Sequence, residues 1–236
     1  MFPYDPMLLA AAQARPRSIP EVIAVQNAIS ALCVDGDGLK WFNWLYLQVT
    51  EAVAARVASG GFTEGAWLAE LDVQFAALYF DALAGFLSGG PVAGCWQALF
   101  ALRSQPKIAR IQFALAGMNA HINHDLALAI DATCRATATT PRHGGALYND
   151  YTAVNTTLDT LVDAAKQTLR VRLLGDALPP VTHLEDTFAA WSVQAARESA
   201  WRNGELLWNL PAAVPLMDMI DGLTTVAGKS LLVPVP

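Results

Sequence analysis

Five polar side chains lie within seven residues of an otherwise apolar stretch: Asn119, His121, Asn123, His124 and Asp125. When residues 111–132 are placed on a helix at 100° per residue, apolar side chains surround it on all sides, which is typical of a buried, central helix. A buried polar group without a partner costs about 1–3 kcal/mol. We therefore expect these side chains to contact one another, water, a metal ion or a ligand. A polar network that only fixes the packing of the helix is the alternative.

His121 and Asp125 stand four residues apart, so they share one face of this helix. A carboxylate beside an imidazole can orient the ring, raise its basicity or share a metal ion with it. In one version, His121, Asp125 and His143 bind a divalent metal ion (zinc, iron or manganese) that activates water for hydrolysis. In a metal-free version, the His121–Asp125 pair is the general acid or base of a lyase, isomerase or cyclase. The small residues Ala114 and Gly117 on this face leave room for a ligand or another backbone.

Other expected helices supply further candidates. Asp72 lies on the apolar face of its helix and is the third candidate catalytic group, with pairing to a core tyrosine or arginine as the alternative. Arg197 is expected to hold an anionic ligand or to pair internally with Asp72 or Asp125. His143 lies in a loop rich in proline and glycine, where an exposed histidine without a role is the alternative. The candidates for substrate binding are Asn43, Tyr46, Tyr79, Asn119, Arg197 and Trp201.

Helix signals run along the whole chain, and no alternating strand pattern competes with them. The expected helices span about 18–33, 37–59, 63–88, 92–103, 107–135, 149–175 and 182–211, followed by a short eighth helix. The residues expected to cap them are Ser18 with Glu21, Asp37, Thr63, Asn149 or Asp150, and Thr182 with Glu185. We predict an all-α single domain over residues 1–236, orthogonal or bundle-like, around a buried central helix near 107–135.

The amino-acid composition bears on how much apolar surface the protein must bury and on which partners it could bind. Hydrophobic residues make up 54% of the 236 residues and charged residues 15%, which is apolar-rich for one domain. We expect either many wholly buried helices or apolar surface that is covered in a homo-oligomer, to which the tail Leu231–Pro236 would contribute. The net charge is −6 and no lysine or arginine cluster is present, which argues against a nucleic-acid partner.

The cysteines and the N-terminal residues bear on localisation. Cys33, Cys95 and Cys134 are widely spaced and odd in number, which favours a reducing compartment over a disulfide framework. The start of the chain, Met1–Pro6, lacks the basic region of a signal peptide. The longest uncharged stretch, Ala82–Leu102, contains a Ser-Gly-Gly-Pro turn, so it predicts two helix ends and no membrane span. We expect a cytoplasmic protein.

Short motifs are spread over most of the chain. The central one is Gly117-Met118-Asn119-Ala120-His121-Ile122-Asn123, followed by Asp125. The others are Phe42-Asn43-x-x-Tyr46, Leu71-Asp72-Val73 with Phe75-Ala76, His143, Asp150-Tyr151, Asn155, Ala196-Arg197 and Ala200-Trp201. By these motifs the chain resembles a family of uncharacterised, mainly actinobacterial proteins that is catalogued as a domain of unknown function. This chain has His124 where the family pattern has arginine, so His124 carries less weight as a site residue. The resemblance implies that these residues belong together, and it implies no activity.

Several reaction classes lack their motifs in this sequence. The chain contains no GxxxxGK[ST] phosphate loop, no GxGxxG, no GxSxG, no HExxH and no Glu-x-x-His pair of the di-iron type. The leading hypothesis is a small-molecule enzyme centred on His121, in which aromatic residues such as Trp41 and Trp44 line a pocket for an apolar or amphipathic molecule. A non-catalytic protein that binds an apolar metabolite is the alternative.

Overall fold

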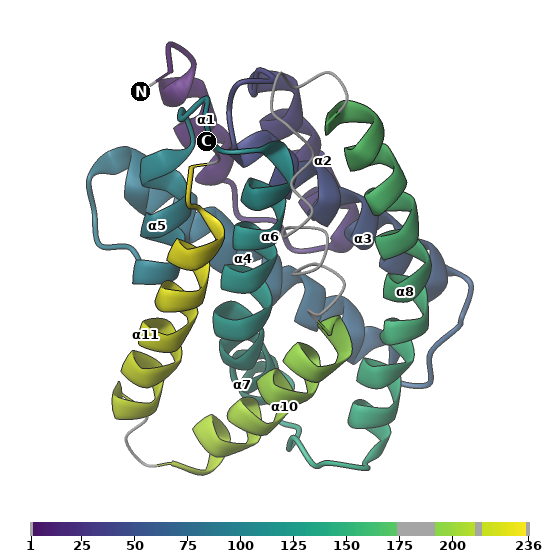
Figure 1. The fold of residues 1–236 in the computed structure, drawn as a ribbon. Coiled ribbons are helices and arrows are strands. Elements are labelled where there is room, and N and C mark those ends of the chain that lie inside the picture. Colours follow the sequence, from purple (N-terminus) through teal and green to yellow (C-terminus); the bar gives the residue numbers. More distant parts are fainter. Residues whose placement is uncertain (1, 174–191, 211–213, 235–236) are drawn as a thin grey trace.

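The computed structural model describes residues 2–173, 192–210 and 214–234. Within these ranges the chain forms helices and no strand, which confirms the all-α class (Figure 1). The elements are α1 (Asp5–Ala12), α2 (Ile19–Leu32), α3 (Leu39–Ala58), α4 (Gly65–Ser88), α5 (Gly94–Leu102), α6 (Arg110–Ala120), η1 (His121–Asp125), α7 (Leu126–Ala136), α8 (Ala146–Leu173), α10 (Val193–Asn209) and α11 (Val214–Leu231).

The segments α6, η1 and α7 follow one another without a break and form a central rod. In Figure 1 this rod runs through the middle of the molecule, with α11 on one side and α3 and α8 on the other. Every residue from Ile111 to Ala120 is buried, as predicted for a central helix. The buried apolar residues form one cluster from Leu8 in α1 to Leu232 after α11. Helices from both ends of the chain share this core, which supports the prediction of a single domain.

The rod differs from the predicted helix over 107–135 in two respects. It begins at Arg110, and a π-helical turn, η1, interrupts it at His121–Asp125. In this turn the N–H of Leu126 bonds to the carbonyl of His121, five residues back instead of four. Single π-helical turns inside α-helices occur frequently at functional sites. This one contains both histidines and the aspartate of the central motif.

The room that the sequence predicts beside Gly117 is filled by an aromatic ring of α3. A Cβ atom at Gly117 would lie 2.3 Å from Cγ of Phe42. Glycine is therefore required for the ring of Phe42 to pack on α6, one turn before His121. The small residue admits a neighbouring side chain where we expected a ligand or a backbone.

The start of α2 agrees with the predicted cap, whereas the N-cap residue of α3 is Gly38, one residue after the predicted Asp37. The hydroxyl of Ser18 accepts the N–H of Glu21 at 3.4 Å, and the Glu21 carboxylate accepts the N–H of Arg17 at 2.8 Å. Asp37 Oδ1 accepts the N–H of Leu39, the first residue of α3, at 3.0 Å. The contacts of Ser18 and Asp37 satisfy N–H groups that the first turn of each helix leaves unpaired.

The predicted caps of α4 and α8 are wrong. The N-cap residue of α4 is Glu64, one residue after Thr63, and its N–H donates to the carboxylate of Asp150. Because α8 begins at Ala146, Asp150 lies inside that helix and does not open it. Asp150 is 8% exposed. It therefore links two helices as a buried cap supplied by a distant part of the chain.

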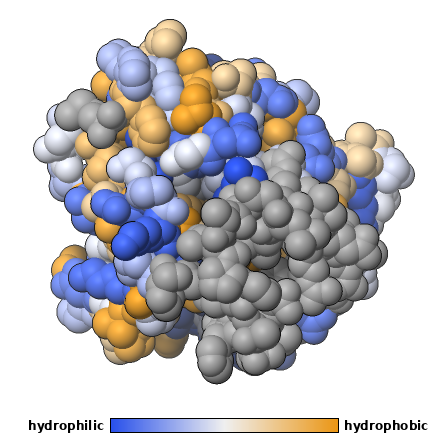
Figure 2. All heavy atoms as spheres, turned by 45° about the horizontal axis from the view of Figure 1, so that its top comes forward, coloured by the Kyte–Doolittle hydropathy of each residue, from blue (hydrophilic) through white to orange (hydrophobic). Residues whose placement is uncertain are grey.

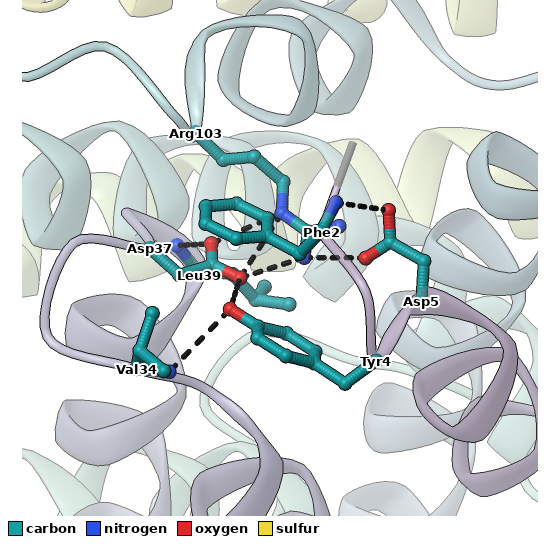
Figure 3. A network of polar contacts seen from close by, with 7 residues as sticks. All are labelled: Phe2, Tyr4, Asp5, Val34, Asp37, Leu39 and Arg103. Carbon is teal, nitrogen blue, oxygen red and sulfur yellow. Dashed lines mark hydrogen bonds and ion pairs between the residues drawn. The ribbon is translucent and has the colours of Figure 1, made fainter.

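A short N-terminal helix, α1, is absent from the prediction. Arg103, at the end of α5, binds Asp5 of α1 at 2.8 Å and Asp37 of the α2–α3 turn at 2.6 Å. The hydroxyl of Tyr4 donates to Asp37 at 2.9 Å, and the guanidinium lies 4.8 Å from the ring centre of Phe2 (Figure 3). A helix of eight residues is too short to be stable on its own, so the ion pair with Arg103 helps to hold α1 in place.

The C-terminal region agrees with the prediction in part. The predicted cap residues Thr182 and Glu185 lie outside the described residues. The described helix α10 begins at Val193, and Ser192 caps it by accepting the N–H of Ala195 at 3.1 Å. After α11, the side chain of Gln112 donates to the carbonyls of Leu231 and Val233 at 2.8 and 2.7 Å. The tail up to Val233 is therefore bound to α6 of the same chain, while a homo-oligomer stays a prediction.

Among the described residues, one helix, α4, is long and apolar enough to cross a membrane by length and composition. Its Tyr79, Phe80 and Leu83 are wholly buried against the other helices, and it carries the buried Asp72. These contacts are those of a core helix. On the face shown in Figure 2, hydrophilic and hydrophobic residues are interspersed, as on most protein surfaces.

Candidate functional site

The carboxylate of Asp125 is the centre of a buried hydrogen-bond cluster. Its Oδ2 accepts from Nε1 of Trp96 at 2.9 Å and lies 3.0 Å from Nδ1 of His121. Its Oδ1 lies 2.7 Å from Nδ1 of His124. Asp125 is 1% exposed. Because an ionised carboxylate can only accept hydrogen bonds, all three nitrogens act as donors to it.

The ionisable groups of this cluster shift one another's pKa. Burial alone would raise the pKa of Asp125, but the hydrogen bonds from His121 and His124 outweigh it and lower this pKa. Burial lowers the pKa of His121, and Asp125 offsets only part of the effect. Burial also acts to lower the pKa of His124, but the hydrogen bond to Asp125 prevails and raises it. At neutral pH, Asp125 is therefore ionised and His121 is neutral.

The hydrogen bond to Asp125 fixes the proton of neutral His121 on Nδ1. The other ring nitrogen, Nε2, then carries a lone pair and is the basic atom of the ring. This is the arrangement in which a carboxylate orients a histidine for proton abstraction. The predicted pairing of His121 with Asp125 is thus present in the structure, inside the π-helical turn.

Five aromatic rings surround the imidazole of His121, and we call them the aromatic cage. Phe75 stacks on it, with ring centres 3.4 Å apart and planes 8° apart, and the ring centre of Tyr46 lies at 4.4 Å. The other three rings, at 5.7 to 6.2 Å, are those of Phe42, Tyr79 and Trp96. Phe75 is the partly exposed member, whereas the other four rings are buried. Among these rings, Phe75 therefore separates His121 from the solvent.

Three buried polar atoms of this region have no hydrogen-bond partner among the described residues. They are Nε2 of His121, the hydroxyl of Tyr46 and Oδ2 of Asp72. Burial raises the pKa of Tyr46 well above its ordinary value, and the charge of Asp72 adds to this effect. Asp72 also stands three residues before Phe75 on α4, so both share one face of the helix. We call this set (His121, Tyr46 and Asp72) the unpaired triad.

Burial raises the pKa of Asp72 from its ordinary value of 3.8 to about 7. A carboxyl group with this pKa exists in both protonation states near neutral pH, so it can give or take a proton at low cost. Tyr46 stays a neutral hydroxyl and can donate a hydrogen bond. The triad therefore combines a base, a carboxyl group that titrates near neutrality and a hydroxyl donor. These are the groups that proton-transfer chemistry requires.

Two predicted substrate-binding residues, Asn43 and Tyr79, have their polar atoms occupied. The side-chain NH2 of Asn43 donates to the carbonyl of Gln26 at 2.9 Å and to the hydroxyl of Ser30 at 2.8 Å. The hydroxyl of Tyr79 donates to Oδ1 of Asn43 at 3.3 Å. These contacts join α2, α3 and α4 and hold two helices of the aromatic cage. Both residues thus support the cage.

Asn119 also has a structural contact that the sequence does not reveal. Its side-chain NH2 donates to the backbone carbonyl of Thr224 at 2.9 Å, and its Oδ1 accepts from Asn123 at 3.0 Å. Gly228 lies alongside, where an added Cβ would be 3.4 Å from the Asn119 amide. Asn119 therefore fastens α11 to the central rod.

Arg197 and Trp201 lie at a different contact, between α8 and α10. Arg197 donates to Asn155 Oδ1 and to the carbonyl of Tyr151, both at 2.7 Å, and its guanidinium lies 4.1 Å from the Tyr151 ring centre. The predicted internal pairing with Asp72 or Asp125 is therefore wrong. Trp201 is wholly buried and packs 4.9 Å from Tyr151 and 6.1 Å from Trp67.

His143 does not join His121 and Asp125. Its side chain is 41% exposed, its Nε2 lies 3.4 Å from Glu198, and its ring lies 4.3 Å from that of Tyr148. The predicted three-residue metal site is therefore not assembled. Among the described residues, one group of three histidine, cysteine or acidic side chains is close enough to share a metal ion. It consists of Cys95, His124 and Asp221.

Residues 19–234 match the model of a family of unknown function (DUF5995). The chain belongs to this family. The match includes every candidate site residue, from Asn43 in α3 to Trp201 in α10. No protein of curated function and no solved structure matched the chain.

In this family member, sequence reasoning gave no site role to four residues: Trp96, Phe75, Cys95 and Asp221. Trp96 donates to Asp125 and lines the cage, but it lies in a short, mostly apolar helix without a charged residue. Phe75 stands within one of the motifs, where its aromatic character indicated core packing and not a stack on His121. Cys95 and Asp221 are distant in sequence from His124, so only the fold brings them together.

Proposed function

We propose that this protein is an enzyme that transfers a proton to or from a small apolar or amphipathic molecule, with His121 as general base and Asp72 as general acid. The observation that carries the proposal is the unpaired triad of buried polar atoms without partners among the described residues. The ring of Tyr46 lies against His121, and Asp72 stands one helical turn before Phe75, which stacks on the same imidazole. Each such atom costs about 1–3 kcal/mol when it is left unpaired. A polar group of a bound substrate would satisfy them, and the aromatic rings would contact its apolar part.

The hydrogen bonds around Asp125 define the part that each residue plays. When Nε2 of His121 accepts a proton, the ring becomes an imidazolium, and the ionised Asp125 stabilises it from the Nδ1 side. Trp96 and His124 hold Asp125 in place by donating to its two oxygens. Asp125 is therefore a positioning residue that acts through His121.

The other two members of the triad would interact with an oxygen atom of the substrate. The neutral hydroxyl of Tyr46 would donate a hydrogen bond where negative charge develops after proton abstraction. The protonated form of Asp72 would then supply the proton that completes the step. A base and an acid arranged in this way suit a lyase or isomerase step. Hydrolysis by a metal ion on His121, Asp125 and His143 has less support, because His143 lies elsewhere.

The cage also fits a second function, a protein that binds an apolar metabolite without converting it. The stacked contact between Phe75 and His121 is the observation that favours it, since the same rings would enclose a ligand. Whichever of the two functions it has, we propose that the protein is located in the cytoplasm. All three cysteines are free and buried, which supports a reducing compartment.

The test is proton exchange with solvent. The full-length protein is incubated in D2O with a panel of ketones, aldehydes and 2-oxo acids, and loss of the α-proton signal is followed by 1H NMR. We expect exchange with at least one compound and a decrease of about 100-fold or more in the variant His121→Gln, which retains bulk but lacks the base.

The control variant is His143→Gln, which changes an exposed histidine outside the cage and should leave exchange unaltered. Binding of a panel compound, seen as ligand-signal saturation, without any exchange would favour the binding protein. Equal exchange in the parent and in His121→Gln would show that His121 is not the base.

A further inference from the structure

A second group of reactive side chains adjoins Asp125 through His124. Cys95 of α5, His124 of η1 and Asp221 of α11 each offer one ligand atom, and these atoms lie within 4.8 Å of one another. The three residues are far apart in sequence, so the fold brings them together. We propose that Cys95, His124 and Asp221 bind a zinc ion at a site separate from the unpaired triad.

The hydrogen bond of His124 leaves the correct ring nitrogen for a metal. Its Nδ1 lies 2.7 Å from Oδ1 of Asp125, so Nε2 is the ring nitrogen without this contact and the one that would bind the ion after losing its proton. A histidine that binds a metal ion almost always donates its other N–H to a carboxylate or carbonyl, which orients the ring. Asp125 already occupies this supporting position.

The other two ligands are positioned by one shared contact. The carboxylate of Asp221 accepts the N–H of Gly94 at 2.8 Å and that of Cys95 at 3.0 Å, which fastens α11 to the start of α5. A Cβ at Gly94 would lie 2.6 Å from the hydroxyl of Thr225, so glycine is needed for this close approach. Oδ1 of Asp221 also accepts from the hydroxyl of Thr225 at 3.3 Å, so the second lone pair of Oδ2 is the one left to bind a cation.

The ligand types select the ion. A thiolate, an imidazole and a carboxylate together favour zinc over magnesium or calcium, which prefer sites made of oxygen alone. In a tetrahedral zinc site with bonds of about 2.0–2.3 Å, neighbouring ligand atoms are roughly 3.5 Å apart. The distance between any two of the three ligand atoms, now up to 4.8 Å, must therefore decrease by at most roughly 1.3 Å. Three protein ligands leave a fourth position for water.

The three ligands differ in their exposure to solvent, which indicates how an ion would reach the site. Cys95 is 1% exposed, while His124 and Asp221 are partly exposed. An ion from solvent would meet the histidine and the carboxylate first and then the buried sulfur. Once bound, it would join α5, η1 and α11, and through His124 and Asp125 it would fix the orientation of His121.

The experiment measures metal binding and needs no substrate, so it is independent of the proposed acid–base reaction. Full-length protein without a histidine tag is freed of metal by a chelator and titrated with Co2+, which reports thiolate coordination by a charge-transfer absorption band. Zn2+ is then added in competition. We expect one equivalent of Co2+, a thiolate band, and complete displacement by Zn2+.

Three variants test two of the ligands and the supporting carboxylate. Cys95→Ala should abolish the thiolate band, and His124→Gln, at a less buried position, should weaken Co2+ binding at least about tenfold. Asp125→Asn removes the supporting carboxylate and should raise the Kd about 10–100-fold. The matched controls Cys134→Ala and His143→Gln change a buried cysteine and an exposed histidine outside the site, and both should bind as the parent does.

Absence of a thiolate band in the folded parent would overturn the proposal. So would a band that persists in Cys95→Ala or that disappears in Cys134→Ala. If Cys95→Ala does not fold, His124→Gln decides, because unchanged affinity in that variant would also contradict the site. Failure of the proton-exchange test leaves all of these outcomes unaffected.

Discussion

The variant Asp72→Asn should change how the stability of the protein depends on pH. Burial raises the pKa of Asp72 from 3.8 to about 7. Between these values the folded protein keeps a proton that the unfolded chain has released. The free energy of unfolding therefore falls as the pH rises through this interval. Asparagine has the same shape and no charge, so it removes this contribution.

The size of the effect follows from the two pKa values. For one group with a pKa of 3.8 unfolded and about 7 folded, the cost to stability is about 2 kcal/mol at pH 5 and about 4 kcal/mol at pH 8. From pH 5 to pH 8, the parent should therefore lose about 2–3 kcal/mol more stability than Asp72→Asn does.

Urea unfolding followed by circular dichroism at pH 5, 6, 7 and 8 measures this difference. The control is Asp81→Asn on the same helix, because Asp81 is 55% exposed and its surface pair with Arg15 is worth at most about 1 kcal/mol. That variant should follow the parent at every pH. If the curve of Asp72→Asn ran parallel to that of the parent, Asp72 would not be a buried carboxyl group with a raised pKa.

Three further variants test contacts that position the site. Asp150→Ala removes the cap that α8 supplies to α4, and we expect a loss of about 1–2 kcal/mol in urea unfolding, whereas no loss would show that the cap is absent in solution. Arg103→Met leaves two buried carboxylates without their partner and should cost about 3–5 kcal/mol, seen as a lower thermal midpoint. An unchanged midpoint would contradict the network of Figure 3. Gly117→Ala forces a methyl group against the ring of Phe42 and should cost about 1–3 kcal/mol, while a variant as stable as the parent would rule out that packing.

The helical fold and the buried centre could be predicted because they depend on local patterns. Apolar residues on every side of the segment around His121 predict a buried helix, and that segment is the central rod. The spacing of His121 and Asp125 predicts their contact, which the structure shows at 3.0 Å. A helix cap formed within one segment, such as Ser18 with Glu21, can be predicted from the sequence for the same reason.

Features that depend on distant parts of the chain were not predictable in this way. Asp150 resembles a cap for its own helix in the sequence, yet it caps α4 because the two helix starts meet in the fold. A single sequence contains no signal for the π-helical turn, which turns both histidines of the motif toward Asp125. His143 seemed available as a ligand, but its loop places it beside Glu198.

The protonation state of His121 is the most direct test of the acid–base centre. Long-range 1H–15N NMR on 15N-labelled protein at pH 7 distinguishes the two ring nitrogens and shows which one carries the proton. A neutral ring with the proton on Nδ1 and an unprotonated Nε2, lost or redistributed in Asp125→Asn, is the predicted result. A proton on Nε2, or a doubly protonated ring at pH 7, would contradict the role of His121 as the base.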